Sequence, residues 1–155
     1  MRSAAPEGVI GQVILVAPDV DADNFTNLAR SIAGFAKGVT LCASSNDRAL
    51  LVSRDFWGNY RAGDVPVTGP LVVPGIDTID VTGMSTDAFA LSHSGYAENE
   101  TLLRDIGQLL LYGLRPPDLR LPNLKKVATV KGEYWRYVNG ADTNSTSAPP
   151  ARVQP

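Results

Sequence analysis

Apolar runs and amphipathic stretches alternate along the first part of the chain. Residues 12–17 and 39–43 are short, continuous apolar runs, which are typical of strands buried on both faces of a parallel sheet. Between them, apolar side chains recur at helical spacing over 24–36. Gly38 is predicted to end this helix, so the pattern indicates a strand–helix–strand unit.

The middle of the chain repeats this order with a long interruption. Residues 47–57 are predicted to form a short helix, and 57–74 form a loop rich in glycine and proline. Such a long loop is expected to be functional or to cover another part of the molecule. Residues 76–82 alternate in part and are predicted to be a third strand.

The last part of the chain holds the clearest helix, over 98–112, which Gly113 should end. Residues 127–130 and 134–138 are predicted to form a small hairpin. Residues 139–155 lack aromatic side chains and are rich in Ser, Thr, Ala and Pro, so we expect a disordered tail. The order of elements predicts an α/β fold over 1–138, with about three parallel strands flanked by helices plus a small C-terminal hairpin.

Composition narrows the classes of partner and cofactor. The 155 residues carry 14 basic and 16 acidic side chains, so no basic surface is expected for nucleic acid. One cysteine and one histidine cannot form an internal disulfide or a multi-histidine metal site, and we expect no cofactor. No apolar run approaches the ~20 residues of a membrane span, and no signal-peptide core is present, which favours the cytoplasm.

Two residues suggest hydrolytic chemistry. Asp47 follows the second predicted strand and His93 lies beyond the third, and working residues of open α/β sheets gather at the carboxyl ends of strands. An acid followed by a histidine is the chain order of an α/β-hydrolase triad. Each residue also has a structural interpretation, because Asp47 could cap the helix from Arg48 and His93 could be a solvated loop residue.

The aspartates after the first strand, at positions 19, 21 and 23, have two interpretations: a helix cap, or auxiliary active-site acids for Asp19 and Asp21. A calcium loop is not supported, because Asn24 and Arg30 stand where the EF-hand pattern needs glycine and glutamate. Cys42 lies within an apolar strand and is expected to behave as a small buried hydrophobic residue.

Four segments together resemble one family. They are residues 11–23 (GQVILVAPDVDAD), 39–50 (VTLCASSNDRAL), 75–82 (GIDTIDVT) and 92–94 (SHS). They resemble bacterial α/β hydrolases of unknown function, often described as esterase/lipase-superfamily proteins, over about residues 8–138. The resemblance implies that Asp47 is the acid and His93 the general base of a catalytic triad, and that the intact protein hydrolyses a small acyl ester.

The family's nucleophile is missing from this sequence. An α/β hydrolase places its serine in a Gly-x-Ser-x-Gly turn upstream of the acid, and no such pattern occurs here. The nearest match, residues 83–87 (GMSTD), lies downstream of Asp47 and has Asp87 in place of the last glycine. We therefore expect the carboxyl-terminal half of an α/β-hydrolase fold, lacking the nucleophile half and inactive as this chain.

Two function classes follow. In the first, the chain is the carboxyl-terminal portion of a serine hydrolase whose nucleophile lies elsewhere. In the second, it is a non-catalytic binding or assembly module derived from a hydrolase, with self-association through an exposed strand edge. An upstream reading frame that encodes Gly-x-Ser-x-Gly would favour the first.

Overall fold

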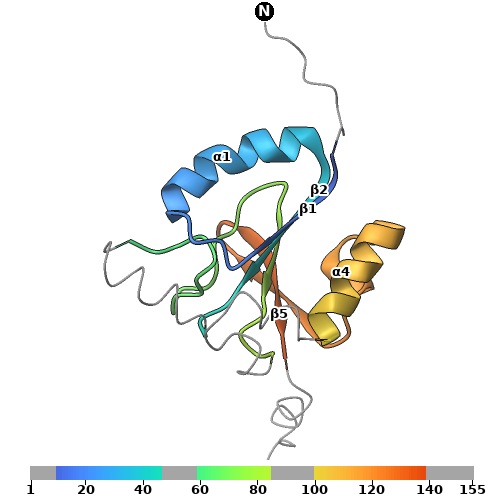
Figure 1. The fold of residues 1–155 in the computed structure, drawn as a ribbon. Coiled ribbons are helices and arrows are strands. Elements are labelled where there is room, and N and C mark those ends of the chain that lie inside the picture. Colours follow the sequence, from blue (N-terminus) through green and yellow to red (C-terminus); the bar gives the residue numbers. More distant parts are fainter. Residues whose placement is uncertain (1–9, 47–58, 85–99, 139–155) are drawn as a thin grey trace, which may run out of the picture.

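The computed structural model describes residues 10–46, 59–84 and 100–138, and these build one mixed sheet (Figure 1). Its strand order is β1-β2-β3-β5-β4. The first three strands run parallel, which confirms the predicted α/β class. They are β1 (Ile10–Val16), β2 (Ala36–Ala43) and β3 (Asp77–Asp80).

The predicted hairpin is longer than expected and belongs to the same sheet. It consists of β4 (Leu124–Thr129) and β5 (Gly132–Tyr137), which pair antiparallel. β5 also pairs in parallel with β3, with Ile79 opposite Trp135. The hairpin therefore extends the parallel sheet and does not form a separate C-terminal appendage.

Burial differs sharply between the two apolar runs. β2 is buried from Gly38 to Ala43. β1 was predicted to be buried on both faces, but it lies at an edge of the described sheet and residues 12–16 are only half-buried. Its apolar side chains join the hydrophobic clusters on both faces of the sheet, yet only β2 pairs with it among the described strands.

The first helix, α1 (Ala22–Phe35), begins at the aspartates that are predicted to cap it, and it ends earlier than expected. Asp21 caps it, because one carboxylate oxygen accepts hydrogen bonds from the backbone N–H groups of Asp23 and Asn24 at 3.1 and 3.0 Å. The prediction that Gly38 ends the helix is wrong. Ala36 is already extended and starts β2, so helix and strand follow each other without a loop.

The second described helix, α4 (Glu100–Tyr112), ends as the sequence predicts. Gly113 has a φ of 62°, a conformation that glycine adopts without strain, and its N–H donates to the Leu109 carbonyl at 2.9 Å. A short 3-10 helix, η2 (Pro117–Leu119), leads from there into β4. Neither described α-helix combines the length and apolarity that a bilayer crossing needs.

The two helices cover opposite faces of the sheet (Figure 1). On the α1 face, Phe25 and Ala29 pack against Val39 and Leu41 of β2. On the α4 face, Leu102 packs in a cluster with five other buried side chains, which are Cys42, Ile79, Val81, Met84 and Leu121.

The α4 face also encloses an ion pair. The Arg120 guanidinium donates from Nε to the Asp105 carboxylate, and both side chains are almost completely buried. Its other nitrogens donate to the Leu114 carbonyl at 3.0 Å and to Thr40 Oγ1 at 3.4 Å. One guanidinium thus joins α4, the segment after it and β2.

Several predicted features lie outside the described residues. They are the helix at 47–57, the loop that carries His93 and the tail at 139–155. The described part of the long loop, from residue 59 to β3, contains no helix and only one isolated bridge, between Asp21 and Arg61. Its apolar residues Ala62 and Val73 pack into the α1-face core, so this loop covers the sheet as the sequence suggested.

Candidate functional site

The parallel strands end together at one edge of the sheet, and the loop from residue 59 to 65 crosses that edge. Backbone hydrogen bonds hold the loop there: Ser44 N–H donates to the Gly63 carbonyl at 2.9 Å, and Gly63 N–H donates to the Pro18 carbonyl at 3.1 Å. A further bond joins Ala62 N–H to the Val20 carbonyl at 2.7 Å. The carboxyl edge is thus a fixed backbone frame made of three chain segments.

Gly63 lets the loop approach the end of β1 closely. A Cβ atom at this position would lie 2.5 Å from the Ala17 carbonyl carbon and 2.6 Å from Pro18 N, which are distances that real Cβ atoms do not reach. Ala17 itself has a φ of 40°, in the left-handed region that L-residues adopt at a cost. The turn after β1 is therefore defined by backbone packing between these two segments.

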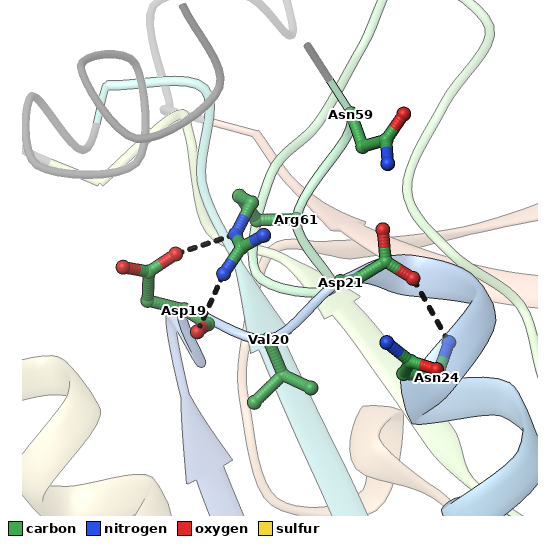
Figure 2. A pocket seen from close by; sticks show the side chains of 6 residues that line it. All are labelled: Asp19, Val20, Asp21, Asn24, Asn59 and Arg61. Atoms are coloured by element: carbon green, nitrogen blue, oxygen red, sulfur yellow. Dashed lines mark hydrogen bonds and ion pairs between the residues drawn. The ribbon is translucent and has the colours of Figure 1, made fainter. Parts of the chain in front are cut away.

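Figure 2 shows the hollow beside this turn, which has a volume of about 450 Å³. Arg61 Nε contacts Asp19 Oδ1 at 2.5 Å, and its Nη2 donates to the Asp19 carbonyl oxygen at 3.0 Å. The Arg61 side chain is 13% exposed and that of Asp19 52% exposed. The residues that line the hollow are Asp19, Val20, Asp21, Asn24, Asn59 and Arg61.

The two candidate auxiliary acids differ in what they do here. Asp19 is ion-paired to Arg61, while Asp21 directs a carboxylate oxygen to the first turn of α1 (Figure 2). The helix-cap interpretation is therefore confirmed for Asp21. A role for either carboxylate in chemistry stays a prediction.

The ends of β2 and β3 are joined by polar contacts just before the predicted triad residues. Ser45 N–H donates to Thr82 Oγ1 at 3.0 Å, and Asn46 Nδ2 donates to the Thr82 carbonyl at 3.0 Å. Asp47 and His93 themselves lie outside the described residues. The structure defines the residues from which the segments carrying Asp47 and His93 begin. Asn46 directly precedes Asp47, and Thr82 lies in the chain between β3 and His93.

Asp80, at the end of β3, is a polar residue of this edge that the sequence analysis missed. Its carboxylate accepts from Thr82 N–H at 3.1 Å and from Arg136 Nε at 3.0 Å, and its side chain is 5% exposed. Arg136 Nη2 donates in turn to the Tyr134 hydroxyl at 2.5 Å. An aspartate between Ile79 and Val81, at the carboxyl end of a strand, is the signal that could have identified it.

Cys42 and the aromatic residues of β5 have structural roles. Burial raises the pKa of the Cys42 thiol to about 12, with the negative charge of Asp105 adding to the effect, so the thiol stays protonated and is not a nucleophile. Tyr134 and Trp135 are buried, and the Trp135 indole N–H donates to Asp118 Oδ1 at 3.2 Å. The Trp135 indole therefore links β5, a strand of the main sheet, to η2.

Metal ligands do not gather in the parts of the chain described here: no three His, Cys, Asp or Glu side chains lie close enough together to hold an ion. The carboxyl edge instead contains carboxylates that are ion-paired with arginine side chains, together with backbone N–H donors.

Comparison with known proteins identifies the family of the chain. No curated protein and no solved structure matches the chain. The family model described as alpha/beta hydrolase of unknown function (DUF900) matches residues 2–111, a range that contains β1, β2, β3, most of α4 and both predicted triad residues. The chain therefore belongs to this family of α/β hydrolases of unknown function.

Proposed function

We propose that this chain supplies the acid and the histidine of a serine hydrolase that cleaves small carboxylic esters, with Asp47 as the acid and His93 as the general base. Family membership supports the hydrolase origin. The observation that carries the residue assignment is the pair of hydrogen bonds from Ser45 and Asn46 to Thr82. They bring the segment entering Asp47 beside the segment leading towards His93, at the edge where α/β enzymes hold their working residues.

In this chemistry each residue has a defined task. The imidazole of His93 accepts the proton of a serine hydroxyl as that oxygen attacks the ester carbonyl, and later returns it to the leaving alcohol. The Asp47 carboxylate accepts a hydrogen bond from the other ring nitrogen and stabilises the imidazolium. The serine and the oxyanion donors must come from residues outside these 155, because no Gly-x-Ser-x-Gly turn occurs among them.

Asp47 is the stronger choice of acid than the aspartates after β1. The Asp19 carboxylate is already ion-paired with the Arg61 guanidinium, and a carboxylate oxygen of Asp21 caps the start of α1. Both carboxylates therefore already have structural partners at the carboxyl edge of the sheet.

The single histidine makes the assignment testable in the chain as it is. We expect the NMR titration of the His93 ring protons to move to lower pH in Asp47→Asn, because removing an adjacent carboxylate removes a stabilising partner of the imidazolium. Asp87→Asn is the matched control, since it removes a carboxylate six positions before His93 and should leave the midpoint unchanged.

Two outcomes would contradict the assignment. A midpoint that does not move in Asp47→Asn shows that the carboxylate and the imidazole are not neighbours. A midpoint that moves in Asp19→Asn or Asp21→Asn instead transfers the acid role to the segment after β1.

The same proposal predicts that the chain alone does not hydrolyse p-nitrophenyl acetate above the buffer rate. A missing oxyanion donor alone costs ~100-fold or more in rate, and here the nucleophile is missing as well. Stoichiometric labelling by a fluorophosphonate probe that is lost in His93→Ala would show that the chain contains its own nucleophilic serine.

A further inference from the structure

Two valines project from the fold without contributing to its core. Val67 lies in the loop that leads to β3, and Val130 lies at the turn between β4 and β5. Their exposed fractions are 108% and 105%, and the next most exposed large apolar side chain among the described residues, Leu111, reaches 75%. Both valines are therefore available for contact with a partner.

The two segments that carry these valines are neighbours. A Cβ atom at Gly132 would lie 3.1 Å from Val72 Cγ1, and one at Gly69 would lie 3.7 Å from the Tyr134 hydroxyl oxygen. Between the loop and the hairpin turn is a hollow of about 470 Å³. Its apolar lining residues come from both segments and are Pro66, Pro70, Leu71, Val72 and Val130.

The hairpin that ends in Val130 is basic, although the chain as a whole is not. Residues 124–137 carry four basic side chains and one acidic side chain, whereas the whole chain has a net charge of -2. Lys125 and Arg136 lie directly opposite each other in the hairpin register, and like charges in such positions destabilise a strand pair. An anionic partner would relieve this repulsion.

Two of the hairpin lysines have free ammonium groups on the side of the hollow. Among the described residues, no acidic side chain pairs with Lys125 or Lys131. Lys131 lines the hollow, and Lys125 lies on the same face of β4 as Thr129, which also lines it. The acidic residues of the hollow, Asp23 and Asp64, belong to α1 and the long loop, and Asp64 is buried.

We propose that this surface, formed by Val67, Val130, Lys125 and Lys131 and here called the hairpin-tip surface, binds the anionic face of a lipid bilayer. Exposed aliphatic side chains enter the boundary between headgroups and acyl chains, while lysines beside them contact anionic headgroups. A nucleic acid would pair with the lysines but leave both valines in water. The combination of charge and protruding apolar groups therefore favours a bilayer.

The place of the hairpin-tip surface in the sheet keeps it accessible. The hairpin lies at the opposite edge of the sheet from β1, with β2 and β3 between them. A strand that adds to β1 extends the sheet away from the hairpin and does not cover the two valines. Binding to a bilayer is thus compatible with a larger hydrolase domain.

Flotation of the 155-residue chain with lipid vesicles tests the proposal. We expect binding to vesicles of phosphatidylcholine and phosphatidylserine at about 3:1, and much weaker binding to pure phosphatidylcholine. Binding should weaken as added salt screens the lysines.

Two pairs of variants separate the contributions of charge and apolar contact. Lys131→Glu should weaken vesicle binding by about tenfold or more, because an attraction becomes a repulsion. Lys37→Glu is its matched control, since it makes the same change in net charge at an exposed lysine of β2. Val130→Asp should weaken binding by about tenfold as well. Its matched control is Leu119→Asp, at a 62% exposed leucine on η2, which precedes the end of β4 away from the turn.

Each outcome decides for or against the proposal once circular dichroism shows that a variant is folded. Loss of binding in Lys131→Glu and Val130→Asp, with binding kept in both controls, supports it. A wild-type chain that does not float with anionic vesicles overturns it. So does binding that Val130→Asp leaves unchanged, which would indicate attraction by charge alone, or binding that the controls weaken equally.

Discussion

Between α1 and the sheet the core consists of aliphatic and aromatic side chains, whereas between α4 and the sheet it also contains Asp105 and Arg120. The first kind of contact is non-directional, and it depends on how closely the side chains pack. The second is directional, because one guanidinium must reach Asp105, Leu114 and Thr40 at once. α4 is therefore held in place by directional polar contacts, and α1 by its packing and its cap.

Removing one member of the buried pair should have the largest effect. Asp105→Ala is expected to lower the free energy of unfolding by about 3–5 kcal/mol, because it leaves the Arg120 guanidinium buried without its counter-charge. Urea unfolding followed by circular dichroism measures this change. The double variant Asp105→Leu/Arg120→Leu, which makes the α4 face resemble the α1 face, should recover most of the loss.

A double variant as unstable as Asp105→Ala would show that the volume and shape at these positions matter more than the unpaired charge. The contrast between the two faces would then rest on packing alone.

The same pair predicts an unusual pH dependence. Burial raises the pKa of the Asp105 carboxyl above its ordinary value, because loss of solvation outweighs the attraction and hydrogen bond from Arg120. The folded state then binds more protons than the unfolded state between the two pKa values. This contribution to stability is fully present below the unfolded value, near 4, and is lost as pH rises through the folded value.

Unfolding measured at several pH values should show this loss with a slope of up to about 1.4 kcal/mol per pH unit in the wild type. The slope should be absent in Asp105→Leu/Arg120→Leu. Glu100→Gln, which removes an exposed carboxylate from the same helix, should keep the wild-type slope. If the double variant retains it, another group is responsible.

The smallest effect is expected at the start of α1. Asp21→Ala should cost about 1 kcal/mol, because the N–H groups of Asp23 and Asn24 lose their acceptor. Asp21→Asn keeps an acceptor oxygen and should be nearly neutral in thermal unfolding. A loss in Asp21→Asn as large as in Asp21→Ala would mean that the charge, and not the cap, stabilises this edge.

The sequence predicts the parts of the fold that depend on local periodicity. The strands around Val13 and Leu41 and the helix around Leu109 follow from apolar spacing, and the end of α4 follows from Gly113. The end of α1 could not be predicted, because the chain passes from Phe35 directly into a strand without a turn residue. The position of the hairpin in the main sheet depends on the distant pairing of β5 with β3.

The candidate site was predictable to a smaller extent. Asp21 is recognisable as a cap because it precedes an amphipathic stretch. The contact of Asp19 with Arg61 spans 42 positions, and no local pattern indicates it. Asp80 and Arg136 are 56 positions apart and meet only because β5 lies beside β3. The pairing of Asp47 with His93 stays a prediction, which the histidine titration tests.

The buried thiol of Cys42 can be used to measure how often α4 separates from the sheet. It is the only cysteine in the chain, and it lies on β2, next to the Asp105–Arg120 pair and under α4. An alkylating reagent can reach it only when α4 and the sheet separate, and with a pKa of about 12 the thiol hardly reacts while it is buried. The rate of its modification therefore reports how often the α4 face opens, in the folded protein and without any added probe.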